Sequence, residues 1–202
     1  MTAMAPALGI AATALSYMTA AYFATRAVAG DERGAPLRRS ATRLALCIAC
    51  AVAGVFAASR GVDLERLVVV GIIVGSLAGA AYARVAGGNV SFVMALLPLA
   101  ATIVSAALDG AWTTIVVAAI VAVPFGLSIA LSRRPSGIED AFLSAVAGAA
   151  LGLIPAILVL FVAAFATIAL SRRHSTTVKT VAFAPSIAAA TLVAVTCNLV
   201  IS

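Results

Sequence analysis

The stretch LVVVGIIVGSLAGAAYA, residues 67–83, decides the fold of this chain. It contains no charged side chain, and its length approaches the ~20 apolar residues that an α-helix needs to cross a bilayer. Within it, Gly71, Gly75 and Gly79 recur at every fourth position, a spacing that lets helices pack closely in lipid. The stretch therefore predicts a membrane-spanning helix with one tightly packed face.

The composition of the whole chain agrees with this interpretation. Of its 202 residues, 64% are hydrophobic and 10% are charged. Soluble domains are roughly half apolar and about a quarter charged, and a soluble core of this size has no room for so much apolar side chain. We therefore predict an all-α, polytopic integral membrane bundle that forms a single domain over residues 1–202.

Eight apolar runs predict eight transmembrane helices. Glycine and proline mark several of their ends, including Gly87-Gly88, Gly110 and Pro155. The first run has the length of a signal peptide, but no Lys or Arg precedes it, so we expect a retained helix. The predicted helices are residues 6–28, 42–58, 67–83, 90–108, 111–131, 137–154, 156–171 and 181–201.

The basic residues alternate between the breaks that separate these helices. Counting Arg26, 11 of the 13 Lys and Arg lie in the breaks after the first, third, fifth and seventh helices. The other two are Arg60 and Arg66. Because positively charged loops stay in the cytoplasm, this basic side is predicted to be cytoplasmic. Both termini are then outside. The basic breaks contain Arg33, Arg38, Arg39, Arg43, Arg84, Arg133, Arg134, Arg172, Arg173, His174 and Lys179.

Three other kinds of site find little support in the sequence. The net charge of +6 is not arranged as a basic stripe interleaved with aromatics, so no nucleic-acid partner is expected. Cys47 and Cys50 form a C-x-x-C pair without a second ligand pair, which favours small buried hydrophobes over metal ligands. His174 lies among basic residues and is expected in solvent. No metal and no cofactor are therefore predicted.

Two of the seven acidic residues, Glu139 and Asp140, stand side by side at the start of the sixth helix. The sequence SGIE, from Ser136 to Glu139, fits a capping box, in which both side chains accept hydrogen bonds from backbone N–H groups. Asp140 is one residue too deep for that motif. The apolar stretch 141–154 spans only about 21 Å, against a hydrocarbon thickness of about 30 Å, so Asp140 is expected near or below the interface. An ionisable group at that depth is a functional hypothesis by default.

Two short motifs frame the last third of the chain. GIED, residues 137–140, opens one helix, and AFAP, residues 182–185, opens the last helix after a basic loop. Over residues 137 to about 198 this order resembles the type IV prepilin peptidases, membrane aspartyl proteases with a GxGD motif. Glu139 replaces the second glycine, and of the family's Pro-Phe-Gly-Pro-like motif only the second proline, Pro185, is present. Phe142 stands where the family usually has Lys.

The resemblance implies a peptidase-like core over about residues 67–201, with residues 1–66 as extra N-terminal helices. It also implies that Asp140 is a catalytic carboxylate flanked by Gly137, Glu139 and Pro185. Aspartyl chemistry needs two carboxylates, one to take a proton from water and one, protonated, to polarise the scissile carbonyl.

The family's first Asp falls near Ala81 or Tyr82, where this chain has no acid. Asp63 and Asp109 lie on the predicted external side. Glu139 lies on the cytoplasmic side, but neighbouring side chains on a helix point about 100° apart. The sequence therefore provides one of the two carboxylates with the expected placement.

Three functions are compatible with these features. The first is a peptidase that removes the leader of type IV pilin-like precursors at the cytoplasmic face, with Asp140 as the surviving catalytic carboxylate. The second is an inactive relative that binds pilin-like helices during pilus or secretion assembly. The third is a small transporter, which the lack of charge in the middle of the first five helices disfavours. The expected partners are the lipid bilayer and a pilin-like precursor helix.

Overall fold

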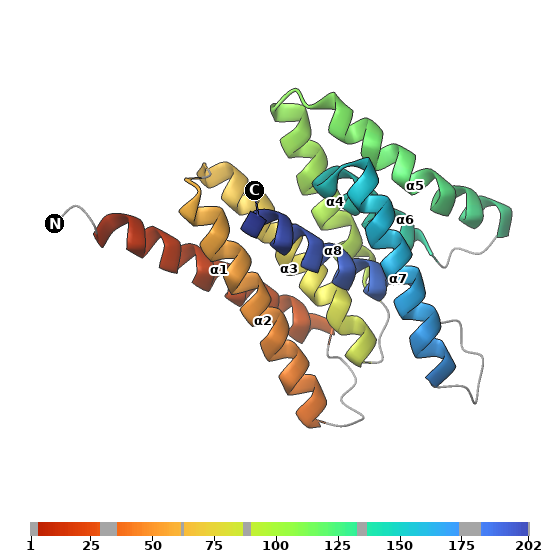
Figure 1. Cartoon of the computed structure of the whole chain (residues 1–202), viewed down its shortest axis with the longest axis horizontal. Helices are drawn as coiled ribbons and strands as arrows, with labels where there is room; N and C mark the ends of the chain where they lie inside the picture. The colour runs from red at the N-terminus through yellow and green to blue at the C-terminus, as the bar shows by residue number, and fades with distance from the viewer. Residues whose placement is uncertain are drawn as a thin grey trace.

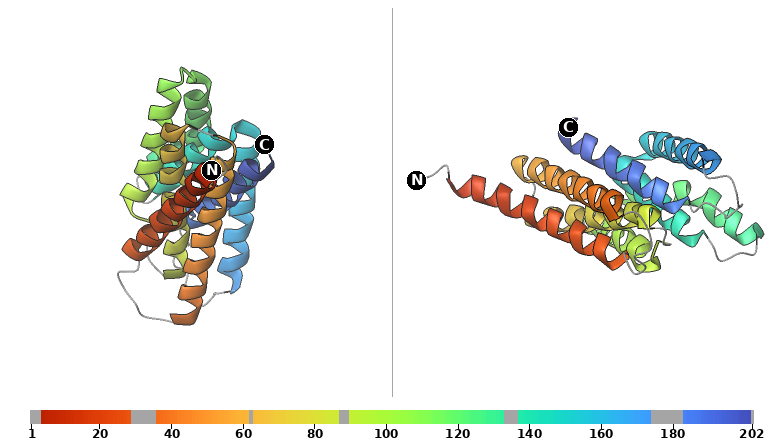
Figure 2. Two further views of the ribbon diagram at one scale, coloured as in Figure 1. Left: turned by 90° about the vertical axis from the view of Figure 1, so that its left-hand side faces the viewer. Right: turned by 90° about the horizontal axis from the view of Figure 1, so that it is seen from below.

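The computed structural model describes residues 4–28, 36–61, 63–86, 90–132, 137–173 and 183–201. Over these ranges the chain forms eight α-helices and no strand, which confirms the all-α class and the number of helices. Successive helices run in alternate directions within one bundle (Figures 1 and 2). The helices are α1 (Met4–Val28), α2 (Pro36–Ser59), α3 (Leu64–Ala86), α4 (Phe92–Leu108), α5 (Trp112–Ser132), α6 (Ile138–Leu151), α7 (Leu153–Arg173) and α8 (Ala184–Ile201).

Four of these helices contain segments that are long and apolar enough to cross a membrane. The segments are Ala7–Ala27, Ser40–Ser59, Leu64–Ala83 and Trp112–Leu131, in α1, α2, α3 and α5. The outer surface of the bundle carries many large apolar side chains, such as Leu108 (78% exposed) and Ile154 (73% exposed). Extended apolar surface of this kind marks a site of contact with other molecules or with lipid. The helices are therefore suited to contact with a bilayer.

α3 lies at the centre of the bundle and contacts α1, α2, α4 and α8. Its glycine stripe faces α1, because a Cβ atom added at Gly75 would lie 3.1 Å from the Cβ atom of Ala20. The same atom added at Gly79 would lie 3.0 Å from the Cβ atom of Ala24. The predicted tightly packed face is confirmed, and its partner is the first helix of the chain.

The observed helix ends lie within three residues of the predicted ones except at the start of α2, and the break between α6 and α7 also falls at another residue than predicted. α2 begins at Pro36 rather than at residue 42, because proline is well accepted in the first turn of a helix. Arg43 is therefore part of α2 and not of a connecting loop. The break between α6 and α7 falls at Gly152, with a φ of +82° that glycine adopts readily, and Pro155 lies inside the first turn of α7.

The start of α6 also differs from the predicted capping box. The N-cap residue is Gly137, with a φ of +119° that an L-residue rarely adopts. The carbonyl oxygen of Gly137 accepts hydrogen bonds from the N–H groups of Asp140 and Ala141, at 3.0 and 3.2 Å. The predicted capping box depends on Ser136, which lies outside the described residues, and the N-cap of α6 is the next residue, Gly137. Glu139 and Asp140 still place two acids in the first turn, where the helix dipole favours negative charge.

The C-x-x-C pair of α2 lies in the main hydrophobic core. Cys50 is fully buried, Cys47 is 6% exposed, and both are free thiols. The Sγ atom of Cys50 lies 3.8 Å from the carbonyl oxygen of Val74 on α3. The prediction that these cysteines act as small buried side chains is confirmed.

Candidate functional site

Asp140 lies in the first turn of α6 and joins it to the start of α8. The side chain is half-buried and accepts a hydrogen bond from the backbone N–H of Ala184. Ala184 is the first residue of α8, so its N–H has no acceptor within its own helix. Asp140 thus supplies an acceptor at the N-terminus of another helix, 44 residues further along the chain.

The electrostatic environment of Asp140 favours its neutral form. Asp140 is in the first turn of α6, before the apolar stretch that begins at Ala141. Burial raises the pKa of Asp140 to about 6, the hydrogen bond from Ala184 opposes this shift, and the nearby charge of Glu139 adds to it. This carboxyl group therefore changes its charge close to neutral pH, as acid–base chemistry requires.

Aromatic pairs hold the segments around Asp140 in place. Phe183, directly before α8, stacks on Phe125 of α5 with ring centroids 5.9 Å apart. Phe142, two residues after Asp140, packs against Phe92 at the start of α4 with centroids 5.5 Å apart. Phe142 occupies the position where the resemblance leads one to expect a lysine, and here it contributes packing. These contacts fix the start of α8 relative to α4, α5 and α6.

A groove of about 610 Å³ opens beside this site, between α2, α3, α7 and α8. Its lining includes Ala81 on α3 and Pro185 on α8, the two further positions that the peptidase resemblance singled out. Pro185 is buried and directly follows Ala184. We call this feature the Ala81–Pro185 groove; it is lined by Thr42, Leu46, Ala81, Leu158, Val159, Val162, Ala163, Ala166, Pro185, Ser186, Ala189, Ala190, Val193 and Ala194.

The fold connects three distant positions through the start of α8. Ala81 and Pro185 line the same groove, and Asp140 contacts the residue before Pro185. Gly137 and Glu139 lie within one turn of Asp140. The first turn of α8 therefore borders both Asp140 and the groove that Ala81 lines.

The predicted external acids are kept away from this site. Asp109, at the end of α4, pairs with Arg66 in the first turn of α3, with Nη2 and Oδ1 3.3 Å apart. Asp63 precedes the same turn of α3. Both acids therefore lie at the opposite end of α3 from Ala81. Among the described residues, the acid whose charge acts on Asp140 is its neighbour Glu139.

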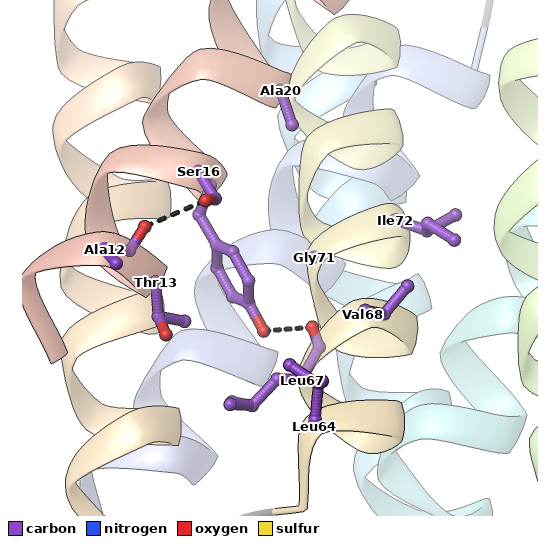
Figure 3. A pocket seen from close by; sticks show the side chains of 10 residues that line it. Ala12, Thr13, Ser16, Ala20, Leu64, Leu67, Val68, Gly71 and Ile72 are labelled. Carbon is purple, nitrogen blue, oxygen red and sulfur yellow. Dashed lines mark hydrogen bonds between the residues drawn. The ribbon is translucent and has the colours of Figure 1, made fainter. Parts of the chain in front are cut away.

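A second pocket, between α1 and α3, carries no such chemistry (Figure 3). The hydroxyl group of Tyr17 donates a hydrogen bond to the carbonyl oxygen of Leu67, at 2.5 Å. Ser16 donates in the same way to Ala12 of its own helix, at 2.8 Å. Because these polar groups are satisfied within the protein and the rest of the lining is mostly apolar, this pocket belongs to the packing of α1 on α3.

One functional-looking residue was not singled out from the sequence. Arg43 on α2 lies over the ring of Tyr82 on α3, with its guanidinium carbon 5.2 Å from the ring centroid. Its Nη2 atom donates to the Tyr82 hydroxyl at 3.3 Å. In the sequence, Arg43 counted as one of many basic residues on the cytoplasmic side. Its partner, 39 residues away, is visible only in the fold.

No protein-family model, curated protein or solved structure matches the chain. Within the part of the chain that the structure describes, no cluster of three His, Cys, Asp or Glu side chains is placed to hold a metal ion. The chemical character of the site therefore depends on Asp140, its neighbour Glu139 and the adjoining groove.

Proposed function

We propose that the chain is a multi-pass protein of a bacterial cytoplasmic membrane, related to the prepilin peptidases, that binds pilin-like precursor helices without cleaving them. The observation that carries this proposal is that the first turn of α8 borders both Asp140 and the groove lined by Ala81 and Pro185. The Ala81–Pro185 groove is apolar in its lining and extends along α7 and α8, which suits the side of an apolar helix.

The number of carboxylates favours binding over cleavage. Aspartyl proteolysis requires two acids that share one proton. Ala81 stands at the position that the resemblance assigns to the first acid, and its methyl side chain cannot move a proton. Asp140 instead accepts a hydrogen bond from Ala184, which is a structural use of the carboxylate. The remaining groups of the groove are apolar or hydroxyl side chains, which suit binding rather than proton transfer.

The orientation follows from the charges and from one ion pair. The contact between Arg66 and Asp109 joins the break before α3 to the break after α4, two breaks that the charge pattern assigns to the same side. This supports the alternation from which we infer that the start of α6 faces the cytoplasm. A precursor helix would then reach the groove from the cytoplasmic end, and both chain termini would be outside.

Site-specific photo-crosslinking tests this function. A crosslinking residue at Val193, which is 63% exposed and lines the groove, is expected to capture a co-expressed, tagged pilin-like precursor at its full length. The matched control is Val123 on α5, which is 61% exposed and lies outside the groove, and we expect no capture there. Equal capture at the two positions, or none at either, would refute helix binding in the groove.

One observation favours a peptidase as the second candidate. The charge of Glu139 raises the pKa of Asp140, so the two carboxyl groups interact and form the only acid pair at this site among the described residues. If the pair cleaves precursors, mass spectrometry will find a shortened precursor in cells that lack their own prepilin peptidase. Glu139→Gln and Asp140→Asn must then each abolish the shortening. Asp31→Asn and Glu32→Gln would reveal whether an acid outside the described residues is the partner.

A further inference from the structure

A pocket of about 440 Å³ lies between α1 and α2, separate from the Ala81–Pro185 groove. One part of its lining is apolar, from Met18, Leu44 and Cys47. The other part carries hydroxyl groups and one guanidinium group. The full lining is Met18, Thr19, Tyr22, Ser40, Arg43, Leu44 and Cys47. An apolar surface beside hydrogen-bonding groups matches an amphipathic ligand such as a lipid.

Arg43 brings a fixed positive charge to this pocket. Its guanidinium group is held against Tyr82, which is 1% exposed, by the ring contact and the hydrogen bond described above. Its Nε atom is buried and has no hydrogen-bond acceptor. A guanidinium group has five N–H donors, so Arg43 retains donors that the protein does not satisfy.

A second arginine reaches the edge of the same pocket. Arg26 on α1 donates a hydrogen bond from Nη1 to the hydroxyl of Tyr22, at 3.2 Å, and Tyr22 lines the pocket. None of the described residues that line the pocket is acidic. The charge that Arg43 and Arg26 bring to this pocket is therefore complementary to an anion.

We propose that this pocket binds an anionic phospholipid, with its phosphate at Arg43 and an acyl chain along Met18, Leu44 and Cys47. The planar guanidinium group donates parallel hydrogen bonds that match phosphate oxygens. Basic pockets between membrane helices on the cytoplasmic side are suited to anionic headgroups. The site lies between the two N-terminal helices and does not depend on the function proposed for the Ala81–Pro185 groove.

Native mass spectrometry of the purified full-length protein tests this proposal. With equal amounts of phosphatidylglycerol and phosphatidylcholine of the same acyl chains, we expect preferential retention of phosphatidylglycerol. Arg43→Gln should reduce that retention about fivefold, the loss expected for one arginine at an anionic membrane surface. The control Arg60→Gln removes an exposed charge beyond the far end of α2 and should bind as the unmodified protein does.

A second variant separates lipid binding from loss of fold, since Arg43 also packs against Tyr82. Leu44 lines the pocket and is 62% exposed, so Leu44→Trp fills the pocket while the Arg43–Tyr82 contact remains. It should lose phosphatidylglycerol binding and unfold at an unchanged temperature. Equal retention of both lipids, or unreduced binding by Leu44→Trp, would overturn the proposal. So would full displacement of the lipid by millimolar inorganic phosphate, because the acyl chain would then contribute nothing.

Discussion

The carboxylate of Asp140 on α6 accepts a hydrogen bond from the backbone N–H of Ala184, the first residue of α8. The contact connects two helix N-termini that are separated in the chain by the whole of α7. It gives Asp140 a structural role whether or not the protein has catalytic activity. The ionisation of this one carboxyl group should therefore influence both the stability and the chemistry of the site.

Asp140→Asn should change how stability depends on pH. Because the pKa of Asp140 is raised from 3.8 to about 6 in the folded state, the folded protein gains stability as pH falls through 6 and loses it as pH rises. The variant lacks this titration. The difference between its unfolding temperature and that of the unmodified protein (variant minus unmodified) should therefore increase as the pH is raised from 4 to 7. The size of the pKa shift limits this change in the free energy of unfolding to about 3 kcal/mol.

Thermal unfolding in detergent micelles at several pH values measures this difference. Asp63→Asn is the control, because Asp63 is exposed at the far end of α3. Its stability relative to the unmodified protein should not show the same rise. An Asp140→Asn curve that runs parallel to that of the unmodified protein would show that the carboxyl group titrates normally.

Ala81→Asp should create proteolytic activity if the proposed relationship to prepilin peptidases is correct. The substitution places an acid in the groove that Pro185 also lines, and Pro185 directly follows the residue that Asp140 contacts, so it would supply the second carboxylate. The expected result is a shortened precursor in cells expressing Ala81→Asp, and a full-length precursor with Ala81→Asn. The additional change Asp140→Asn should abolish the activity. A stable Ala81→Asp protein that captures precursor from Val193 without shortening it would show that the two acids do not meet.

Gly79→Ala should destabilise the bundle. The added Cβ atom would lie 3.0 Å from the Cβ atom of Ala24 and 3.2 Å from the Sδ atom of Met94, so α1 and α3 would have to separate. We expect a loss of about 1–3 kcal/mol. Gly126→Ala on α5 is the matched control, since a Cβ atom there meets nothing within 4 Å. That variant should gain up to about 1 kcal/mol from helix propensity. Thermal unfolding of both proteins compares them, and equal effects would contradict the close packing.

Cysteine labelling should place Arg66 and Asp109 on the same side of the membrane. With the three native cysteines replaced, Arg66→Cys and Asp109→Cys should each react with a membrane-impermeant maleimide in intact cells. Both native side chains are well exposed, and their contact places the two loops together. Arg26→Cys, at the end of α1, should react only after the membrane is opened. Labelling of Arg26→Cys in intact cells would reverse the proposed orientation.

Much of the fold could be predicted because it depends on local hydrophobicity. An uncharged run such as residues 67–83 forms a helix in lipid whatever its neighbours are, since its backbone groups must bond within the segment. The ends of helices were less predictable. Gly152 and Pro155 can each mark a break between helices in the sequence. The break lies at Gly152, because proline is acceptable in the first turn of a helix and Pro155 is part of α7.

The sequence by itself determined the all-helical class, the number of helices and the packing stripe of Gly71, Gly75 and Gly79. These features follow from side-chain size and polarity along one segment. Only the tertiary structure decided that the stripe faces α1, that Asp140 binds the N-terminus of α8, and that Arg43 lies against Tyr82. Contacts between distant segments depend on which helix surfaces fit together, and this complementarity is a property of the packed bundle rather than of any one run of residues.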